Sequence, residues 1–176
     1  MPALAGAAAE EIGRVVARVD PDDAVSAVAA IVAARRVFLA GSGRSGLVAR
    51  AVAMRLMHTG LSAYSVGEAA TPAIGDGDLL VAVSATGGGA VVEQARTARR
   101  VGADVLAVTA APEAPLAGEA DRLLVLPART AVPTIQHAGS LFEQSTLVLG
   151  DALCLAVRLA LGVPESDLDA RHANLA

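Results

Sequence analysis

Apolar positions follow a helical spacing at the start of the chain. Between Leu4 and Val19 they recur every three or four residues, as on one face of a helix. The next segment, Asp20-Pro-Asp-Asp23, supplies a capping aspartate, a proline for the first turn and acids near the positive end of a helix. It predicts a second helix to about Ala34, so residues 1–34 are expected to form an N-terminal helical extension.

Short continuous apolar runs replace this spacing from Arg36 onward, and each is typical of a buried strand. Helices are expected between these runs, because longer segments with helical periodicity separate them. Alternation of this kind predicts parallel strands, right-handed crossovers and helices on both faces of one sheet. The expected strands cover residues 36–40, 63–66, 78–84, 104–109 and 122–126, and the expected helices cover about 45–58 and 91–100, with a helical turn near 116–119.

The C-terminal part is expected to form one long helix and a short final one. Pro127 to Gly139 has the composition of a loop, and Ser140 to Leu161 then shows a helical pattern. The first half of this helix is apolar on nearly every side, so we expect it to be buried on more than one side. The final helix opens at Pro164 and carries Arg171 and His172.

Composition indicates one folded domain over residues 1–176 rather than a disordered chain. Hydrophobic residues make up 54% of it and charged residues 18%. Aromatic residues are only 2%, so the core must be built from aliphatic side chains. The formal net charge is −4 and no basic run stands out, which argues against a nucleic-acid partner.

Several features favour a cytoplasmic protein without a membrane span. The most apolar stretch, residues 147–161, is short for a bilayer and contains Asp151 and Arg158. The N-terminus carries acids at residues 10–11 and lacks the basic start of a signal peptide. Cys154 is the only cysteine, lies in an apolar run, and is expected to be a small buried hydrophobe. A lone cysteine also fits a reducing compartment.

Two loops rich in glycine and hydroxyl groups follow predicted strands and open helices. In the first, Gly41-Ser-Gly-Arg-Ser-Gly46, backbone N–H groups of Gly41 and Gly43 and the hydroxyls of Ser42 and Ser45 can cradle an anion. The second is Ser84-Ala-Thr-Gly-Gly-Gly89. Ligands of open α/β sheets bind outside the carboxyl ends of the strands, so two such loops predict one shared phosphate site. Its candidate donors in the second loop are Ser84, Thr86 and Gly87.

The first loop also matches the dinucleotide-binding pattern G-x-G-x-x-G. Glu68 lies about 20 residues further on, where a ribose-binding acid belongs in that fold. The hydroxyls and Arg44 in the loop suit a terminal phosphate better than a buried pyrophosphate. The second hydroxyl-bearing loop in the same sheet also favours a phosphate monoester, and ordinary strand–helix turns remain the alternative for both loops.

Further motifs resemble one family along nearly the whole chain. The two Ser/Gly loops resemble the SIS (sugar isomerase) domain, and additional segments resemble the 6-phospho-3-hexuloisomerases within it. The second loop departs from the family pattern, Ser-Gly-Ser-Gly followed by Thr or Glu-Thr, and is one residue shorter. The matching segments are Gly41 to Val48, Ala53-Met-Arg-Leu-Met-His58, Gly67-Glu68, Thr71-Pro-Ala-Ile74, Gly77 to Leu80, Gln136-His-Ala-Gly-Ser-Leu-Phe-Glu-Gln144 and Arg171-His-Ala-Asn-Leu175.

This resemblance implies a fold, a reaction and an assembly. The fold is a single SIS domain, a three-layer α/β/α sandwich around a mostly parallel five-stranded sheet, flavodoxin-like or Rossmann-like. The reaction interconverts D-arabino-hex-3-ulose 6-phosphate and D-fructose 6-phosphate through an enediol(ate), and it needs no metal and no cofactor. The expected partners are the phosphosugar and further copies of the chain, as a homodimer or homotetramer. A non-catalytic module that senses a phosphosugar is the alternative, although the segment before Arg36 is short and not basic for a DNA-binding domain.

The reaction needs a base, donors for an oxyanion and a phosphate clamp. Glu143, in the first turn of the long helix, is the candidate base, and the resemblance places the family's catalytic glutamate there. His172 is the candidate acid or proton shuttle, and Arg44 is expected to stabilise the enediolate or hold the phosphate. Glu68, Thr71 and His58 are expected to line the sugar pocket, with packing an equally good role for His58; His137 is a weaker candidate. The three histidines lack metal-ligand spacing.

Overall fold

The computed structural model describes residues 1–175 and contains one parallel five-stranded sheet. The strand order is β2-β1-β3-β4-β5, which is the flavodoxin-like order. Because the order reverses at β1, the chain moves outward to β2 and then returns to the other side of β1. The strands are β1 (Val37–Gly41), β2 (Ala63–Ser65), β3 (Leu79–Ser84), β4 (Asp104–Thr109) and β5 (Arg122–Val125).

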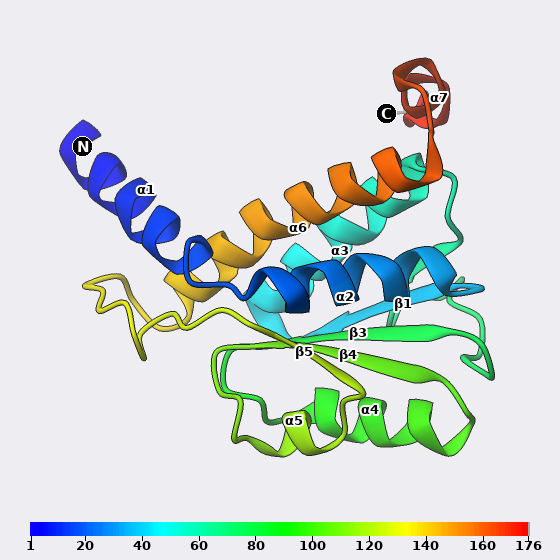
Figure 1. Cartoon of the computed structure of the whole chain (residues 1–176), viewed down its shortest axis with the longest axis horizontal. Coiled ribbons are helices and arrows are strands. Elements are labelled where there is room, and N and C mark those ends of the chain that lie inside the picture. Colours follow the sequence, from blue (N-terminus) through cyan, green and yellow to red (C-terminus); the bar gives the residue numbers. More distant parts are fainter. Residues whose placement is uncertain (176) are drawn as a thin grey trace.

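The helices occupy the segments that the periodicity predicts (Figure 1). Asp20 caps the second helix as expected, because its side chain accepts a hydrogen bond from the N–H of Asp22 at 2.8 Å. The long helix has the predicted bounds. The helices are α1 (Pro2–Val16), α2 (Pro21–Ala33), α3 (Gly43–His58), α4 (Ala90–Arg100), α5 (Pro115–Gly118), α6 (Ser140–Leu161) and α7 (Glu165–Arg171).

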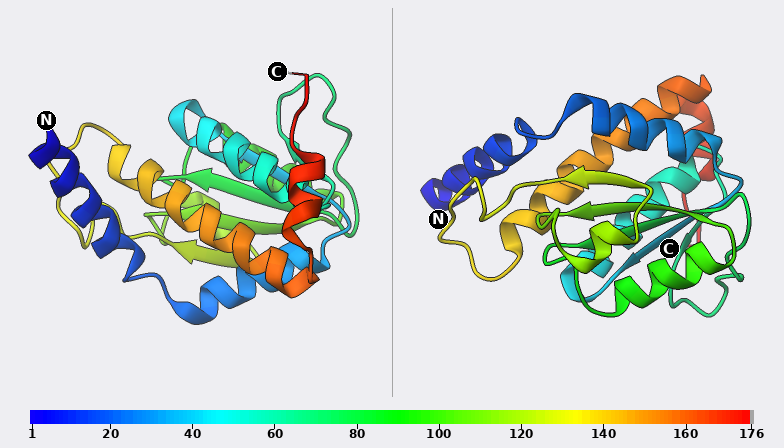
Figure 2. Two further views of the ribbon diagram at one scale, coloured as in Figure 1. Left: turned by 90° about the horizontal axis from the view of Figure 1, so that it is seen from above. Right: turned by 60° about the horizontal axis from the view of Figure 1, so that its bottom comes forward.

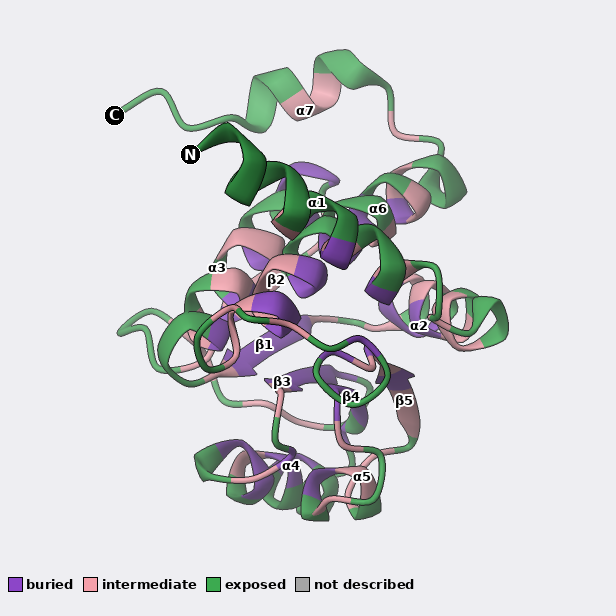
Figure 3. Cartoon of the chain, turned by 90° about the vertical axis from the view of Figure 1, so that its left-hand side faces the viewer, coloured by how far each residue is buried: buried purple, intermediate pink, exposed green. Residues whose placement is uncertain are grey.

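Alternating strand residues divide the core into two layers of side chains. On one face, Leu39 and Val81 belong to the cluster that α2, α3 and α6 cover. On the other face, Phe38 and Leu80 pack with residues of α4 and α5. Figure 3 shows buried strands between these two helical layers. The predicted three-layer α/β/α sandwich is therefore confirmed.

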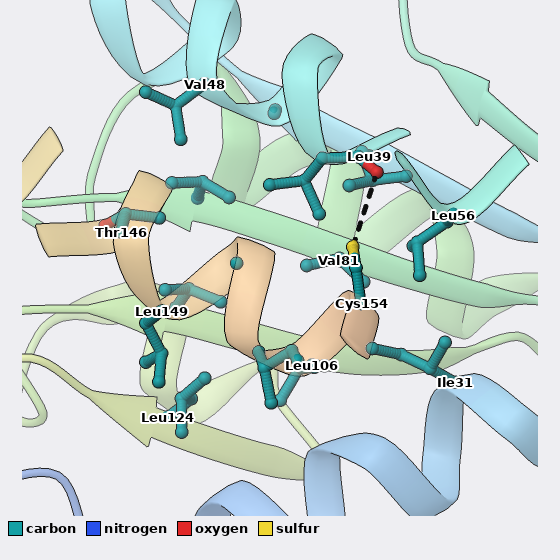
Figure 4. Close-up of a pocket in the computed structure, with 16 residues that line it drawn as sticks. Ile31, Leu39, Val48, Leu56, Val81, Leu106, Leu124, Thr146, Leu149 and Cys154 are labelled. Carbon is teal, nitrogen blue, oxygen red and sulfur yellow. Dashed lines mark hydrogen bonds between the residues drawn. The ribbon is translucent and has the colours of Figure 1, made fainter. Parts of the chain in front are cut away.

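The helices α3 and α6 approach each other closely at Gly150. A Cβ atom at this position would lie 2.5 Å from Cγ2 of Val52, so only glycine permits this distance. Beside this contact, a small apolar cavity of about 40 Å³ remains between the two helices and the sheet (Figure 4). Cys154 lines it and is buried, and burial above all raises the pKa of its thiol to about 12. The prediction that Cys154 is a buried hydrophobe is confirmed.

The helix α6 (Ser140–Leu161) is longer than the apolar stretch 147–161, whose short length argues against a membrane span. With 22 residues and a mean hydropathy of 1.4 over its most apolar window, it could cross a bilayer by length and composition alone. In the fold it lies across α1, α2 and α3 and buries Leu141, Phe142 and Val157 on its inner side. Its outer side, including Leu147 and Val148, is exposed. The expected burial on more than one side is therefore not reached within one chain.

A buried ion cluster fixes the opposite edge of the sheet, where the strands begin. The carboxylate of Asp78 is fully buried and accepts hydrogen bonds from Arg36, at 2.6 Å, and from Arg35. It also accepts the N–H of Gly75 at 2.8 Å. Burial alone would raise the pKa of Asp78, but these donors outweigh it and lower the pKa to about 2. The cluster therefore ties the segment before β3 to the start of β1.

Replacement of Asp78 by asparagine should destabilise the protein in a pH-dependent way. An aspartate in an unfolded chain titrates near pH ~3.9, so the stabilisation is complete above about pH 4 and is lost as the pH falls toward about 2. We expect Asp78→Asn to lower the free energy of unfolding by about 2–3 kcal/mol at pH 7. Urea unfolding at pH 7 and pH 3 checks this. Asp76→Asn, at an exposed neighbouring aspartate, is the control and should change the free energy of unfolding little. If Asp78→Asn lowered the free energy of unfolding equally at both pH values, the result would contradict the account.

Candidate active site

The two predicted phosphate loops leave neighbouring strands at the same edge of the sheet. β1 and β3 pair directly and in parallel, with Gly41 opposite Val83, so the loops after Gly41 and Ser84 emerge side by side. This is the point at which the strand order reverses, where open α/β sheets bind ligands. The arrowheads in Figure 2 point to this edge, and α6 also begins there. The structure therefore brings both loops together as predicted.

The first loop is wound tightly enough to require its glycines. A Cβ atom at Gly41 would lie 2.9 Å from the backbone N of Gly46, and one at Gly46 would lie 2.7 Å from the carbonyl oxygen of Gly41. Gly43 has a φ of +58°, which residues other than glycine rarely adopt. α3 begins here without an acid in its first turn, so its free N–H groups and dipole favour an anion. Ser42 is exposed at the helix cap, whereas Ser45 is buried.

The second loop is held by its own hydrogen bonds and by the turn before α5. The hydroxyl of Ser84 donates to the carbonyl oxygen of Gly88 at 3.3 Å, and the N–H of Gly87 donates to the carbonyl oxygen of Ser84 at 3.2 Å. Gly87 has a φ of +62°, and a Cβ atom added to it would clash with the Cβ of Ala114. Thr86 is exposed at the loop's tip. The loop thus offers two hydroxyls on a braced backbone.

Glu143 lies in the first turn of α6 and forms an ion pair with Arg44 of the first loop. The two side chains differ in accessibility, since 12% of the Glu143 side chain is exposed against 61% for Arg44. The carboxylate also lies over Gly139, where a Cβ atom would come 3.2 Å from Oε1. A shielded carboxylate therefore stands beside the candidate anion-binding loop and is paired with an exposed guanidinium of that loop.

The loop before α6 is anchored by a residue that the sequence did not single out. Glu11 of α1 is buried, and its Oε2 accepts the hydroxyl of Thr134 at 2.7 Å and the side-chain amide of Gln136 at 2.8 Å. The hydrogen bond from Gln136, and then that from Thr134, lower the pKa of Glu11. The one local signal is a charged residue within the apolar spacing of α1, close to Ile12.

Glu68 and Thr71 lie on the β2 side of the first loop. Glu68 is exposed and forms an ion pair with Arg50 of α3 at 3.6 Å. The hydroxyl of Thr71 donates to the carbonyl oxygen of Ser65 at 2.5 Å. A hollow of about 190 Å³, lined in part by Arg50 and Ser65, adjoins the loop here. Their predicted role in the sugar pocket stays a prediction.

The structure does not bring the two candidate histidines to Glu143 within one chain. His58 ends α3 and is buried, while His172 follows α7, and their rings stack with centroids 5.2 Å apart. The length of α3, about 24 Å for 16 residues, separates this pair from Arg44. Burial, then His172 and Arg55, lower the pKa of His58. His137 is exposed in the loop before α6.

This arrangement can bind a phosphate and remove a proton from the molecule that carries it. The helix dipoles of α3 and α4 and the hydroxyls favour the anion, and the shielded carboxylate of Glu143 can act as a base. Within residues 1–175, no group of three or more His, Cys, Asp or Glu side chains is placed to hold a metal ion.

Comparisons with known proteins agree with this geometry. The SIS domain family matches residues 30–156. A 3-hexulose-6-phosphate isomerase from Mycobacterium gastri is 42% identical over 172 residues, covering 94% of this chain and 86% of that protein. One from Bacillus subtilis is 37% identical and covers 82% of each chain. A crystal structure from Methanococcus jannaschii, from which a function of 3-hexulose-6-phosphate isomerase was inferred, aligns with a TM-score of 0.81 and 30% identity over 88% of this chain and 86% of that one.

The phosphate site can be tested one hydroxyl at a time. Ser42→Ala, Ser84→Ala and Thr86→Ala should each raise KM for a phosphosugar about 10- to 100-fold, because each removes a hydrogen bond to a charged group. Steady-state kinetics of the three variants check this, with Thr97→Ala on the exposed side of α4 as the control. Kinetics unchanged in all three would mean that the loops are only turns.

Proposed function

This chain belongs to the SIS-domain family of 3-hexulose-6-phosphate isomerases, and we propose that it interconverts D-arabino-hex-3-ulose 6-phosphate and D-fructose 6-phosphate. The relatives of that name and the geometry of the site both support this function. It is an isomerase that moves a carbonyl between C3 and C2, and its substrate is a phosphosugar.

The observation that carries the proposal is the ion pair between Glu143 and Arg44. One partner is a shielded carboxylate, and the other belongs to the loop suited to the phosphate. The pair supports the proposal, because it holds a carboxylate suited to act as a base next to the loop suited to the phosphate, as an isomerase of a phosphorylated sugar requires. A module that only binds the phosphosugar would have no need of a shielded carboxylate at that place.

In the forward direction, Glu143 removes the proton from C2 of the hexulose. The electrons of the broken C–H bond form the C2–C3 double bond, and the C3 carbonyl oxygen becomes the enediolate oxyanion. Arg44 is placed to stabilise this charge once the carboxylate of Glu143 has been neutralised by the proton. Transfer of the O2 proton to O3 and return of the proton from Glu143 to C3 then give the C2 ketone and the C3 hydroxyl, so atoms and charges balance without a cofactor.

The assembly is a homodimer or homotetramer, and the exposed side of α6 supports this. Leu147, Val148 and Leu155 are exposed there, and an apolar groove of about 500 Å³ runs between α2 and α6. Contiguous apolar surface of this kind usually marks an interface. In its own chain, His172 lies beside His58 and far from Glu143. In an oligomer, His172 could instead contribute to the active site of a neighbouring copy.

In the cell, the enzyme acts in the cytoplasm as part of the ribulose monophosphate pathway. The similarity to 3-hexulose-6-phosphate isomerases and the single cysteine, which is free and fits a reducing compartment, support this. Formaldehyde fixation and pentose phosphate supply are the two metabolic roles that such an isomerase serves.

The role of Glu143 predicts the behaviour of one isosteric variant. Glu143→Gln should reduce turnover to background in both directions, while phosphosugar affinity and thermal stability stay near those of the wild type, because glutamine keeps the shape but cannot take the proton. A coupled assay and calorimetric titration with fructose 6-phosphate measure the two effects. Glu10→Gln, at an exposed glutamate of α1, is the matched control and should remain active. An active Glu143→Gln enzyme would show that another residue is the base.

The assembly can be tested on the outer side of α6. The wild type should scatter light as a dimer or tetramer at micromolar concentration, and Leu155→Lys should shift it toward monomer and reduce activity. Val101→Lys, at an equally exposed apolar position beyond α4, is the control and should change neither. A wild-type monomer with full activity would contradict both the assembly and the proposed reach of His172 into a neighbour's site.

A further inference from the structure

We infer that Glu11 is a positioning residue for the catalytic base, acting through the loop that leads into α6. The inference rests on the proposed role of Glu143. Glu11 lies on α1, far from the phosphate loops in sequence, and it does not belong to the site itself.

The anchor is a compact set of hydrogen bonds. Oε2 of Glu11 accepts both the hydroxyl of Thr134 and the side-chain amide of Gln136. The hydroxyl of Thr134 in turn accepts the backbone N–H of Gln136 at 3.0 Å. One carboxylate oxygen of Glu11 thus holds two side chains and, through them, the backbone between them. In Figure 2, α1 lies beside this loop and the start of α6.

Three residues separate this anchor from the first turn of α6. Ala138 has a φ of +49°, and its carbonyl oxygen accepts a hydrogen bond from Arg129. Gly139 follows as the helix cap, accepts the N–H of Glu143 at 3.0 Å and lies under its carboxylate. The segment between Gln136 and Glu143 is therefore short and held by these contacts. A change in the position of Gln136 shifts the cap on which the Glu143 carboxylate rests.

The phosphate loops do not depend on this anchor. They follow β1 and β3 and are braced by their own glycines, by α3 and by the turn before α5. Loss of the Glu11 contacts should therefore displace the base relative to a phosphosugar that is still bound. Small displacements of a reacting group reduce the rate much more than they reduce ground-state binding.

The kinetic test compares variants that remove the anchor with variants that keep it. Glu11→Ala and Thr134→Val should each lower kcat about 10- to 100-fold with KM within about 2-fold of the wild type. Glu10→Ala, at the exposed neighbouring acid, and Thr134→Ser, which keeps the hydroxyl, should retain wild-type kcat. Light scattering and thermal unfolding establish that each variant is assembled and folded.

A second measurement does not depend on turnover. Amide hydrogen exchange over residues 134–143 should accelerate in Glu11→Ala and Thr134→Val, while exchange over residues 42–46 and 84–89 stays unchanged. An inactive wild type would count against the proposed function, but hydrogen exchange over residues 134–143 would still test the anchor. Wild-type kcat in both variants, a rise in KM that matches the loss of kcat, or unchanged exchange over residues 134–143 would overturn the inference.

Discussion

The direct parallel pairing of β1 with β3 is the constraint on which the rest of the structure depends. It places the loops after Gly41 and Ser84 at one edge, at the point where the strand order reverses. The helices α3 and α4 then start there with their positive ends, and α6 starts at the same edge with Glu143. This topology therefore brings the candidate anion-binding loops and the carboxylate of Glu143 to one edge of the sheet.

The proposed base, Glu143, is held by contacts from both ends of the chain. Arg44 links the Glu143 carboxylate to the phosphate loop, and Glu11 fixes the segment that precedes α6. The N-terminal helix, which adds no strand to the sheet, is therefore part of the frame that carries the chemistry. The outer side of α6 stays apolar and open, so the same helix that bears the base also offers the surface for a second copy.

The helices, the strands and the meeting of the two candidate loops could be predicted from the sequence, because they depend on local patterns and on the pairing rules of parallel sheets. Periodicity gave the helices and strands, Asp20 gave a helix start, and the glycine pattern gave the first phosphate loop. The contacts of Glu11 could not be predicted, because its partners lie more than 120 residues away and no local pattern encodes them. The stacking of His58 with His172, far from Glu143, was missed for the same reason.

The central claim is that a phosphate-binding edge and a base act together on one sugar. The most direct measurement is proton NMR of fructose 6-phosphate in D2O with the purified wild-type enzyme, beside a parallel sample of fructose. The account predicts that deuterium replaces the hydrogen at C3 of fructose 6-phosphate as the hexulose phosphate appears, with negligible exchange in fructose. Absence of exchange and of hexulose in fructose 6-phosphate, or equal exchange in both sugars, would contradict it.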